Sequence, residues 1–388
     1  MTTEPLTIVC VNGWCRNGST IIGNVLNEVP GFFHVGELHF LWKNSAGKGS
    51  NNLCGCGTEL TRCPVWAPIL PVGRPAGVSA ADFADTVVRR QWASVRTRHT
   101  WRVLRRGLRN DDIRAHAELM TGIYHAIAER TGARVIVDTT KIGGEAALLS
   151  RLDGIAPYYV HLVRDPRAVA QSWSHRKDYA YALTPWQSTG YWYGFNLAAA
   201  AIAKRHRDRS MFLRYEDFTA DPAGTIDALL KFCGAGPAGN PVTGGRTVEL
   251  HTNHTVTGNP DRFNSGPTVI RARDDTWRSQ LATSAKLTAV ALSWPLARRY
   301  GYRYLDTLRH GDRQPPGAGE RGPSTSTTSV LGEMGWILAC RIKSRWSRAG
   351  RAAWAWPSPG NWRQRARTWP SAPATRTGSP PPNATSRR

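Results

Sequence analysis

A glycine-bearing loop follows the first apolar run of the sequence, and its residue types suit the binding of an anion. The run from Leu6 to Val11 (LTIVCV) is short and rich in β-branched residues, which is typical of a buried strand. The following loop, Gly13 to Thr20 (GWCRNGST), has the glycine spacing of the phosphate loop G-x-x-x-x-G-K-[ST], but Ser19 stands in the lysine position. Backbone N–H groups at such a turn can hold a phosphate. We expect Arg16 to supply the cation and Ser19 and Thr20 to supply hydroxyl groups. An ordinary strand–helix turn with a capping serine is the alternative.

A second candidate anion site lies in the segment from Val160 to Ser172 (VHLVRDPRAVAQS). A strand is expected to end at Arg164, with Asp165 as the N-cap and Pro166 in the first turn of a helix. Arg164 would then lie at the carboxyl end of a parallel strand, where α/β sheets bind ligands. Together with Ser172, two turns along the helix, it predicts a second phosphate site. Alternatively, Arg164 pairs with an acid and Ser172 lies on the surface.

Strand-like and helix-like runs alternate along the first 306 residues. Apolar strand-like runs occur at 6–11, 135–138, 158–163 and 211–215, and helical patterns at about 144–152, 166–175 and 222–233. Residues 74–130 look helical, and a final helix near 284–300 precedes a strand-like YGYRYL run. This alternation predicts an α/β domain over residues 1–306, built on a P-loop-like parallel sheet with helices on both faces.

The composition sets the last part of the chain apart. The 388 residues carry a net charge of +23, and nearly half of it lies in residues 307–388. That stretch mixes Pro, Ser, Thr, Gly, Arg and Trp without a helical or strand period. We expect a disordered, basic, low-complexity tail, either an unselected extension or a segment that contacts anionic surfaces weakly.

Other features limit the class of protein. The N-terminus has no basic region typical of a secretory signal, and no run approaches the ~20 apolar residues of a transmembrane helix. We therefore expect a cytoplasmic protein with no transmembrane segment. Seven cysteines are an odd number at low density, which argues against a secreted disulfide framework.

With these motifs in place, the sequence resembles the sulfotransferases that use 3′-phosphoadenosine 5′-phosphosulfate (PAPS), in particular bacterial carbohydrate-type members. The loop CRNGSTIIGNVL is similar to that family's 5′-phosphosulfate loop, and LVRDPRAVAQS is similar to its 3′-phosphate segment. LRYEDFTADPAGTIDALLKFCG resembles the later strand–helix unit, whose tyrosine, here Tyr215, lies near the adenine in some members. NHTVTGNPDRF, which contains Arg262, is similar to the closing segment of carbohydrate-type members. The similarity covers about residues 5–305.

The resemblance implies transfer of a sulfonate group from PAPS to a hydroxyl or amine of a small molecule, glycan or glycolipid, with release of 3′,5′-ADP. Catalysis would depend on positioning and on neutralising charge, without a metal, so the missing P-loop lysine is expected. The implied donor-binding residues are Arg16, Asn17, Gly18, Ser19, Thr20, Arg164, Ser172, Tyr215 and Arg262.

A carboxylate is the expected general base. Glu37, in VGEL, corresponds to the glutamate proposed as base in carbohydrate-type members, and the Lys-Thr-His motif of steroid- and phenol-type members is absent. Asp138 and Lys141, in VIVDTTK, follow another strand and are further candidates near the sulfonate. The expected catalytic residues are therefore Glu37, Arg16 and Lys141. Glu37 could instead be a helix or salt-bridge residue.

Three cysteines at C-x-C-x₆-C spacing, Cys54, Cys56 and Cys63, lack a clear fourth metal ligand. His34 or His39 could complete such a site, but a loop disulfide or reduced thiols are at least as consistent with the sequence. Because some bacterial members have a similar CGCG…CPVW stretch, we interpret it as a structural loop on the acceptor side and expect no metal. His34, His39 and His161 are each better explained as structural residues.

Two other functions are suggested by parts of the sequence. A P-loop nucleotide kinase is disfavoured because the loop lysine is missing and no acid has an obvious magnesium-binding context. A nucleic-acid-binding protein is suggested by a sequence pI of about 10.5, but much of the charge belongs to the tail and no nucleic-acid motif appears. We therefore expect no specific nucleic-acid partner.

Overall fold

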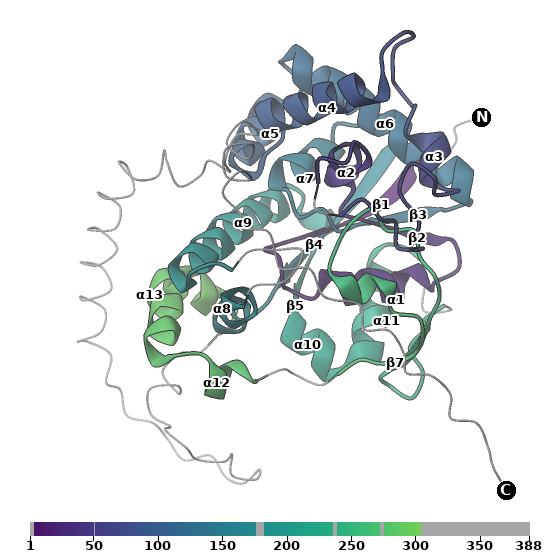
Figure 1. Cartoon of the computed structure of the whole chain (residues 1–388). Coiled ribbons are helices and arrows are strands. Elements are labelled where there is room, and N and C mark those ends of the chain that lie inside the picture. The colour runs from purple at the N-terminus through teal and green to yellow at the C-terminus, as the bar shows by residue number, and fades with distance from the viewer. Residues whose placement is uncertain are drawn as a thin grey trace, which may run out of the picture. The chain divides into compact units, whose positions relative to one another are not determined.

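A five-stranded parallel sheet forms the centre of the protein (Figure 1). The computed structural model describes residues 4–49, 51–175, 182–235, 239–271, 275–302 and 304, so the predicted tail lies outside them. The strand order is β2-β3-β1-β4-β5. The strands are β1 (Leu6–Asn12), β2 (Phe32–Gly36), β3 (Val135–Asp138), β4 (Ile155–Val163) and β5 (Ser210–Arg214).

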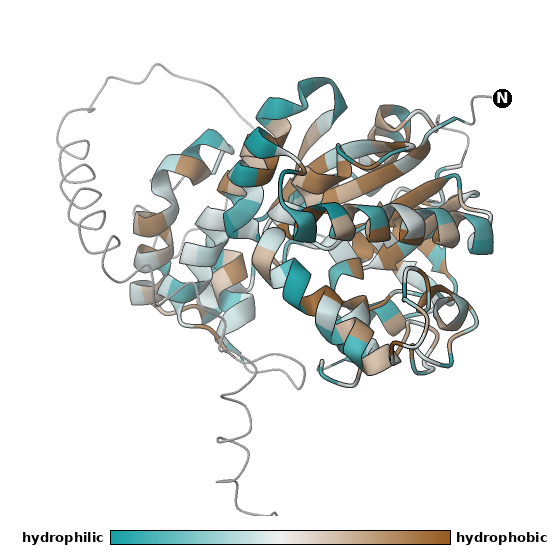
Figure 2. Cartoon of the chain, turned by 90° about the horizontal axis from the view of Figure 1, so that it is seen from above, coloured by the Kyte–Doolittle hydropathy of each residue, from teal (hydrophilic) through white to brown (hydrophobic). Residues whose placement is uncertain are grey.

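Helices cover both faces of the sheet, because strands such as β1 have apolar side chains on both faces. Ile8 and Cys10 point into one core, which also contains residues of α4 (Ala80–Ser94), α6 (Asp111–Thr131) and α7 (Gly143–Leu149). Val9 and Val11 point into a second core, with α1 (Ser19–Asn27) and α11 (Pro222–Phe232). Figure 2 shows the hydrophobic strands enclosed between the helices. A strand that is apolar on both faces is stable only between two such layers.

A third group of helices packs beside the ends of β4 and β5. Within it, α8 (Pro166–Ser174), α9 (Pro185–Arg205) and α13 (Thr283–Arg299) enclose an aromatic cluster that includes Trp14 and Trp192. The remaining helical segments are η1 (Leu38–Phe40), α2 (Leu41–Ser45), α3 (Trp66–Ile69), η2 (Thr97–His99), α5 (Thr100–Arg106), η3 (Arg207–Arg209), α10 (Tyr215–Ala220), η4 (Pro260–Phe263) and α12 (Trp277–Gln280). An antiparallel pair, β6 (Thr247–Leu250) and β7 (Gly266–Val269), forms a separate small sheet.

The predicted fold class is confirmed. The four predicted strands and the helices predicted after them occur within a few residues of their expected positions, and residues 74–130 are helical where they are regular. Two differences stand out. Strand β2 was not predicted, and Tyr302 and Tyr304 of the YGYRYL run do not form a strand but bury their rings beside α13. The domain boundary near residue 306 stays a prediction.

No helix in the described part of the chain is both long and apolar enough to cross a membrane.

Candidate active site

Most of the residues singled out from the sequence lie where the parallel strands end. Loops leave the carboxyl ends of β1, β2, β3 and β4 on the same edge of the sheet, and the chain passes from β3 across β1 to β4. Such a reversal of strand order opens a crevice at the carboxyl edge, which is the usual ligand site of an open α/β sheet.

The loop after β1 is pinned to the neighbouring strand. Asn17 is 1% exposed, and its Nδ2 donates to the Leu162 carbonyl at 2.9 Å while its Oδ1 accepts from the Ser19 amide at 3.3 Å. Gly18 has a left-handed φ of 90°, and a Cβ there would lie 2.2 Å from the ring of Tyr215. Glycine is therefore required at this turn. Gly18, the N-cap of α1, has no side chain, and Asn17 holds the Ser19 amide, so the amides of Gly18 and Thr20 keep the anion-binding character expected of this loop.

Lys141 lies between this loop and Glu37. Its Nζ donates to Glu37 Oε1 at 2.7 Å, to Ser19 Oγ at 3.3 Å and to the Thr139 carbonyl at 2.5 Å. Burial by itself lowers the pKa of the Lys141 ammonium, but the negative charge of Glu37 and other neighbours outweighs it, and that pKa is raised above its usual value. The side chain thus stays charged at neutral pH although only 4% of it is exposed.

Backbone strain marks the same place. Arg16 (φ 71°) and Lys141 (φ 65°) are the two non-glycine residues with left-handed backbones in the part of the chain that the structure describes. This conformation is unfavourable for residues with a Cβ, and such strain is concentrated at functional sites.

The two candidate bases have different surroundings. Both oxygens of Asp138 are held within the protein, Oδ2 by the Tyr124 hydroxyl and Oδ1 by the Thr140 amide, each at 2.7 Å. Burial raises the pKa of Asp138, partly offset by these hydrogen bonds. Glu37, directly after β2, keeps 20% of its side chain exposed. Of the two carboxylates, Glu37 is therefore the one that an acceptor can approach.

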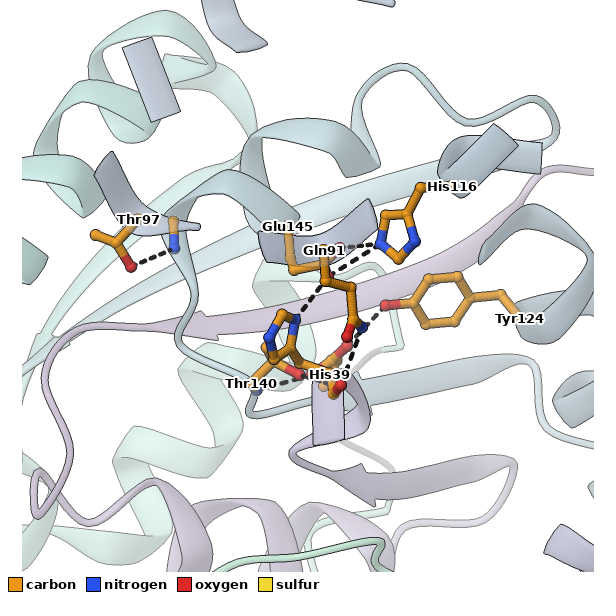
Figure 3. A network of polar contacts seen from close by, with 9 residues as sticks. His39, Gln91, Thr97, His116, Tyr124, Thr140 and Glu145 are labelled. Carbon is orange, nitrogen blue, oxygen red and sulfur yellow. Dashed lines mark hydrogen bonds and ion pairs between the residues drawn. The ribbon is translucent and has the colours of Figure 1, made fainter. Parts of the chain in front are cut away.

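A buried polar network supports the loop that carries Lys141 (Figure 3). Glu145 accepts from His39 Nδ1 at 2.7 Å and from His116 Nε2 at 3.0 Å, and the amide of His39 donates to Thr140 Oγ1 at 3.2 Å. Burial by itself raises the pKa of Glu145, but His116 and His39 outweigh it and lower that pKa to about 2. Sequence reasoning missed Glu145 and His116, because no local motif relates residues on two separate helices.

The second candidate anion site adjoins the first. The Arg164 guanidinium carbon lies 4.6 Å from the Tyr215 ring centroid, and Nη1 donates to the Arg16 carbonyl at 3.1 Å. Ser172 lies further along α8 and is half-buried. The Arg16 guanidinium stacks over Trp173, also on α8, at 4.7 Å. The structure thus brings Arg16, Arg164 and Tyr215 together beside Gly18.

Arg262 is placed differently. It is completely buried, and its terminal nitrogens donate to the carbonyls of Thr255 and Leu53 (both 2.9 Å) and to Asn51 Oδ1 (2.7 Å). This geometry gives Arg262 a structural role at the junction of two loops. A contact between Arg262 and the donor stays an untested prediction.

The histidines predicted to be structural have structural contacts. His34 lies between Asn24 Oδ1 and Thr139 Oγ1, each 3.2 Å from a ring nitrogen, and burial lowers its pKa to about 3. His161 Nε2 lies 3.1 Å from Asn196 Oδ1, and burial lowers its pKa to about 4. His34 and His39 therefore do not complete a site with Cys54, Cys56 and Cys63.

His161 should make stability depend on pH. Its ordinary pKa is about 6.5 in the unfolded chain, so the unfolded state binds more protons than the folded state as pH falls toward 5. The neutral ring therefore contributes to the free energy of unfolding above about pH 6.5, and this contribution is lost as the pH falls. The loss should reach up to about 2 kcal/mol between about pH 7.5 and pH 5. Urea unfolding of the wild type and of His161→Phe at both pH values measures this, and a difference between the two proteins that does not change with pH would contradict it.

The chain is similar to known sulfotransferases. A model of the sulfotransferase family matches residues 74–236. The sulfotransferase domain from the Synechococcus PCC 7002 olefin synthase is 19% identical and covers 78% of this chain and 97% of its own, with a TM-score of 0.43. The sulfotransferase domain from the curacin biosynthetic pathway is 15% identical, over 76% of this chain and 98% of its own, with a TM-score of 0.42. A sulfotransferase from Alicyclobacillus acidocaldarius is 12% identical, over 80% and 100%, with a TM-score of 0.30. No curated protein matches the sequence.

Proposed function

We propose that this chain is a sulfotransferase, as the match of residues 74–236 to the sulfotransferase family supports, and that it transfers a sulfonate group from PAPS to a hydroxyl or amine acceptor and releases 3′,5′-ADP. The observation that carries the proposal is the position of Lys141, whose ammonium group contacts both Ser19 of the phosphate loop and Glu37. One buried cation thus joins an anion-binding loop to a carboxylate that can act as a base.

The donor fits the residues that are present. In the loop, Ser19 stands where a P-loop would have its lysine. Lys141, from the segment after β3, places its ammonium group against the Ser19 hydroxyl. The amides of Gly18 and Thr20 at the start of α1 would hold the 5′-phosphosulfate, while Asn17 fixes the loop by binding the Leu162 carbonyl and the Ser19 amide. A hydroxyl and an ammonium group beside an uncapped helix N-terminus are a suitable donor set for a sulfated phosphate.

The residues of the site have different roles in the transfer. PAPS supplies a sulfonate bonded to a phosphate, and that phosphate gains negative charge as the bond breaks. Lys141 is placed to stabilise this charge, with Arg16 as a second cation in the loop. Glu37 accepts the proton that the acceptor loses. Before the donor binds, Glu37 and Lys141 neutralise each other; an added anion competes for Lys141 and leaves the Glu37 carboxylate able to take the proton.

Arg164, Ser172 and Tyr215 are proposed to hold the nucleotide part of the donor. Arg164 already contacts the Arg16 carbonyl, so its guanidinium group lies directly beside the phosphate loop. Tyr215 offers an aromatic ring between Gly18 and Arg164, suited to the adenosine. The acceptor would be a small molecule, glycan or glycolipid, and the reaction would take place in the cytoplasm.

The contribution of the 3′-phosphate to nucleotide binding tests whether PAPS is the donor. The wild type should bind 3′,5′-ADP more tightly than 5′-AMP by about tenfold to a hundredfold at fixed salt, because a charge-assisted hydrogen bond to phosphate contributes about 1.5–3 kcal/mol. Arg164→Ala should remove most of this difference while changing 5′-AMP binding little, and Ser172→Ala should reduce it more mildly. Isothermal titration with both nucleotides measures these affinities.

The matched control is Arg205→Ala, which removes an exposed arginine near the end of α9. It should keep the full discrimination, which separates a specific phosphate contact from a general loss of positive charge. Equal affinity of the wild type for the two nucleotides would remove the PAPS assignment.

A further inference from the structure

Three thiols and one imidazole from two distant segments of the chain converge outside the site described above. Cys54, Cys56 and Cys63 come from the loop before α3, and His254 comes from the segment after β6. Their ligand atoms all lie within 4.8 Å of one another. The Sγ atom of Cys63 is 3.4 Å from that of Cys54 and 3.9 Å from that of Cys56. His254 Nδ1 is 3.3 Å from Cys63 Sγ and 3.6 Å from Cys54 Sγ.

These four separations are close to the edge lengths of a metal tetrahedron. With Zn–S bonds of about 2.3 Å and Zn–N bonds of about 2.0 Å, a tetrahedral site places sulfur atoms about 3.8 Å apart and sulfur and nitrogen about 3.5 Å apart. A disulfide would require about 2.05 Å between two sulfur atoms, and the three cysteines are free. The spacing therefore fits one shared ion and not a disulfide.

The backbone around the four residues already has a fixed geometry. The Cys54 amide donates to the Thr58 carbonyl at 2.7 Å, and the Gly57 amide donates to the Cys54 carbonyl at 2.9 Å, so this stretch is a tight turn. The indole of buried Trp66 donates to the His254 carbonyl at 2.6 Å. The ligands are thus positioned by contacts that do not depend on their side chains.

The buried Arg262 supplies a second, independent observation. Its guanidinium group binds the carbonyls of Leu53 and Thr255, which adjoin Cys54 and His254 in the sequence. Glu37 acts on the Arg262 guanidinium group only from beyond ion-pair distance, and the buried Nε has no hydrogen-bond partner among the described residues. A fully buried cation without a directly paired counter-charge is costly. Three thiolates and one imidazole around a divalent ion carry one net negative charge, which would balance it.

We propose that Cys54, Cys56, Cys63 and His254 bind a structural zinc ion. Three thiolates and one imidazole in tetrahedral arrangement are a ligand set that selects zinc. All four positions are filled by protein atoms, so no open position remains for a substrate, and the ion has a structural role. Sequence reasoning expected no metal and considered His34 or His39 as the fourth ligand, whereas His254 occupies that place.

The zinc site would brace the segment that supports Glu37. Two residues after His254, the amide of Val256 donates to the Val35 carbonyl at 2.9 Å, and the Glu37 amide donates to the Thr257 carbonyl at 3.3 Å. A Cβ at Gly36 would lie 2.7 Å from the Thr257 carbonyl oxygen, so glycine permits this close approach. Zinc would therefore tie the cysteine loop to the chain that lies along the end of β2.

Metal analysis of the full chain, purified without a polyhistidine tag, tests the proposal. We expect about one zinc per chain by inductively coupled plasma mass spectrometry. Cys63→Ser and His254→Gln should each lower zinc retained after dialysis against a chelator by about tenfold or more. Cys233→Ser is the matched control, because this thiol is also buried but lies outside the cluster, and it should retain full zinc.

Cobalt substitution gives a readout that does not depend on how well the variants fold. Replacing the zinc of the wild type with Co²⁺ should produce the intense visible absorption of a tetrahedral cobalt–thiolate site, with three thiols protected from alkylation until a chelator is added. Wild-type protein from zinc-replete cells that contains well below one zinc per chain, or that has a disulfide between Cys54 and Cys63, would overturn the proposal.

Discussion

Replacing Lys141 with methionine is expected to lower the turnover number by about a hundredfold to a thousandfold, the usual effect of removing one group that stabilises transition-state charge. The ammonium group contacts Ser19 and Glu37 directly, and methionine keeps a similar length without the charge. Because lysine and methionine both have a Cβ, the left-handed backbone at this position is equally strained in both proteins. The rate of label transfer from radiolabelled PAPS, with an acceptor first found in a metabolite extract, measures the effect.

The control for this variant is Lys231→Met, which removes an exposed lysine from α11 and should keep full turnover. Since the pKa of Lys141 is raised, the wild-type rate should also show no loss from deprotonation of this lysine through the neutral range. If Lys141→Met has the same turnover as the wild type, the sulfonate-side cation is another residue, and Arg16 becomes the first candidate.

The framework of the fold could be predicted because it depends on local pattern. The apolar runs that form β1, β3 and β4 are almost entirely buried, whereas the edge strand β5 leaves Phe212 exposed. The alternation of all four runs with helices is visible without tertiary information. Strand β2 was missed because Phe32–Gly36 is short, includes a histidine and ends in glycine. Its pairing with β3 is a long-range contact that a local pattern does not contain.

The parts of the site that depend on tertiary contacts were harder to predict. The loop glycines and the Arg164 segment follow strands, so their place at the carboxyl edge could be expected from the fold class. Glu37 and Lys141 were both expected near the sulfonate, but their direct contact joins the segments after β2 and β3 through a strained backbone, which the sequence does not indicate. His254 lies 200 residues from Cys54, so spacing rules for metal ligands could not connect them.

Glu37→Gln is the second substitution with a large expected effect. A general base contributes about a hundredfold to ten-thousandfold to the rate, so turnover should fall within that range. Affinity for 3′,5′-ADP should change little, because glutamine still offers Lys141 an oxygen acceptor and the loop amides are untouched. Initial rates at saturating PAPS and titration with 3′,5′-ADP measure the two quantities separately.

Asp138→Asn distinguishes the two carboxylates, and Glu249→Gln serves as an exposed control on β6. Because Asp138 is held by Tyr124 and Thr140, its replacement should lower stability more than turnover per folded molecule. The double variant Lys141→Met/Glu37→Gln should lose less than the product of the two single losses, because each partner acts through the same ion pair. Full turnover in Glu37→Gln combined with inactive Asp138→Asn would transfer the role of base to Asp138, and the Glu37–Lys141 pair would then serve only to hold the ammonium group beside Ser19.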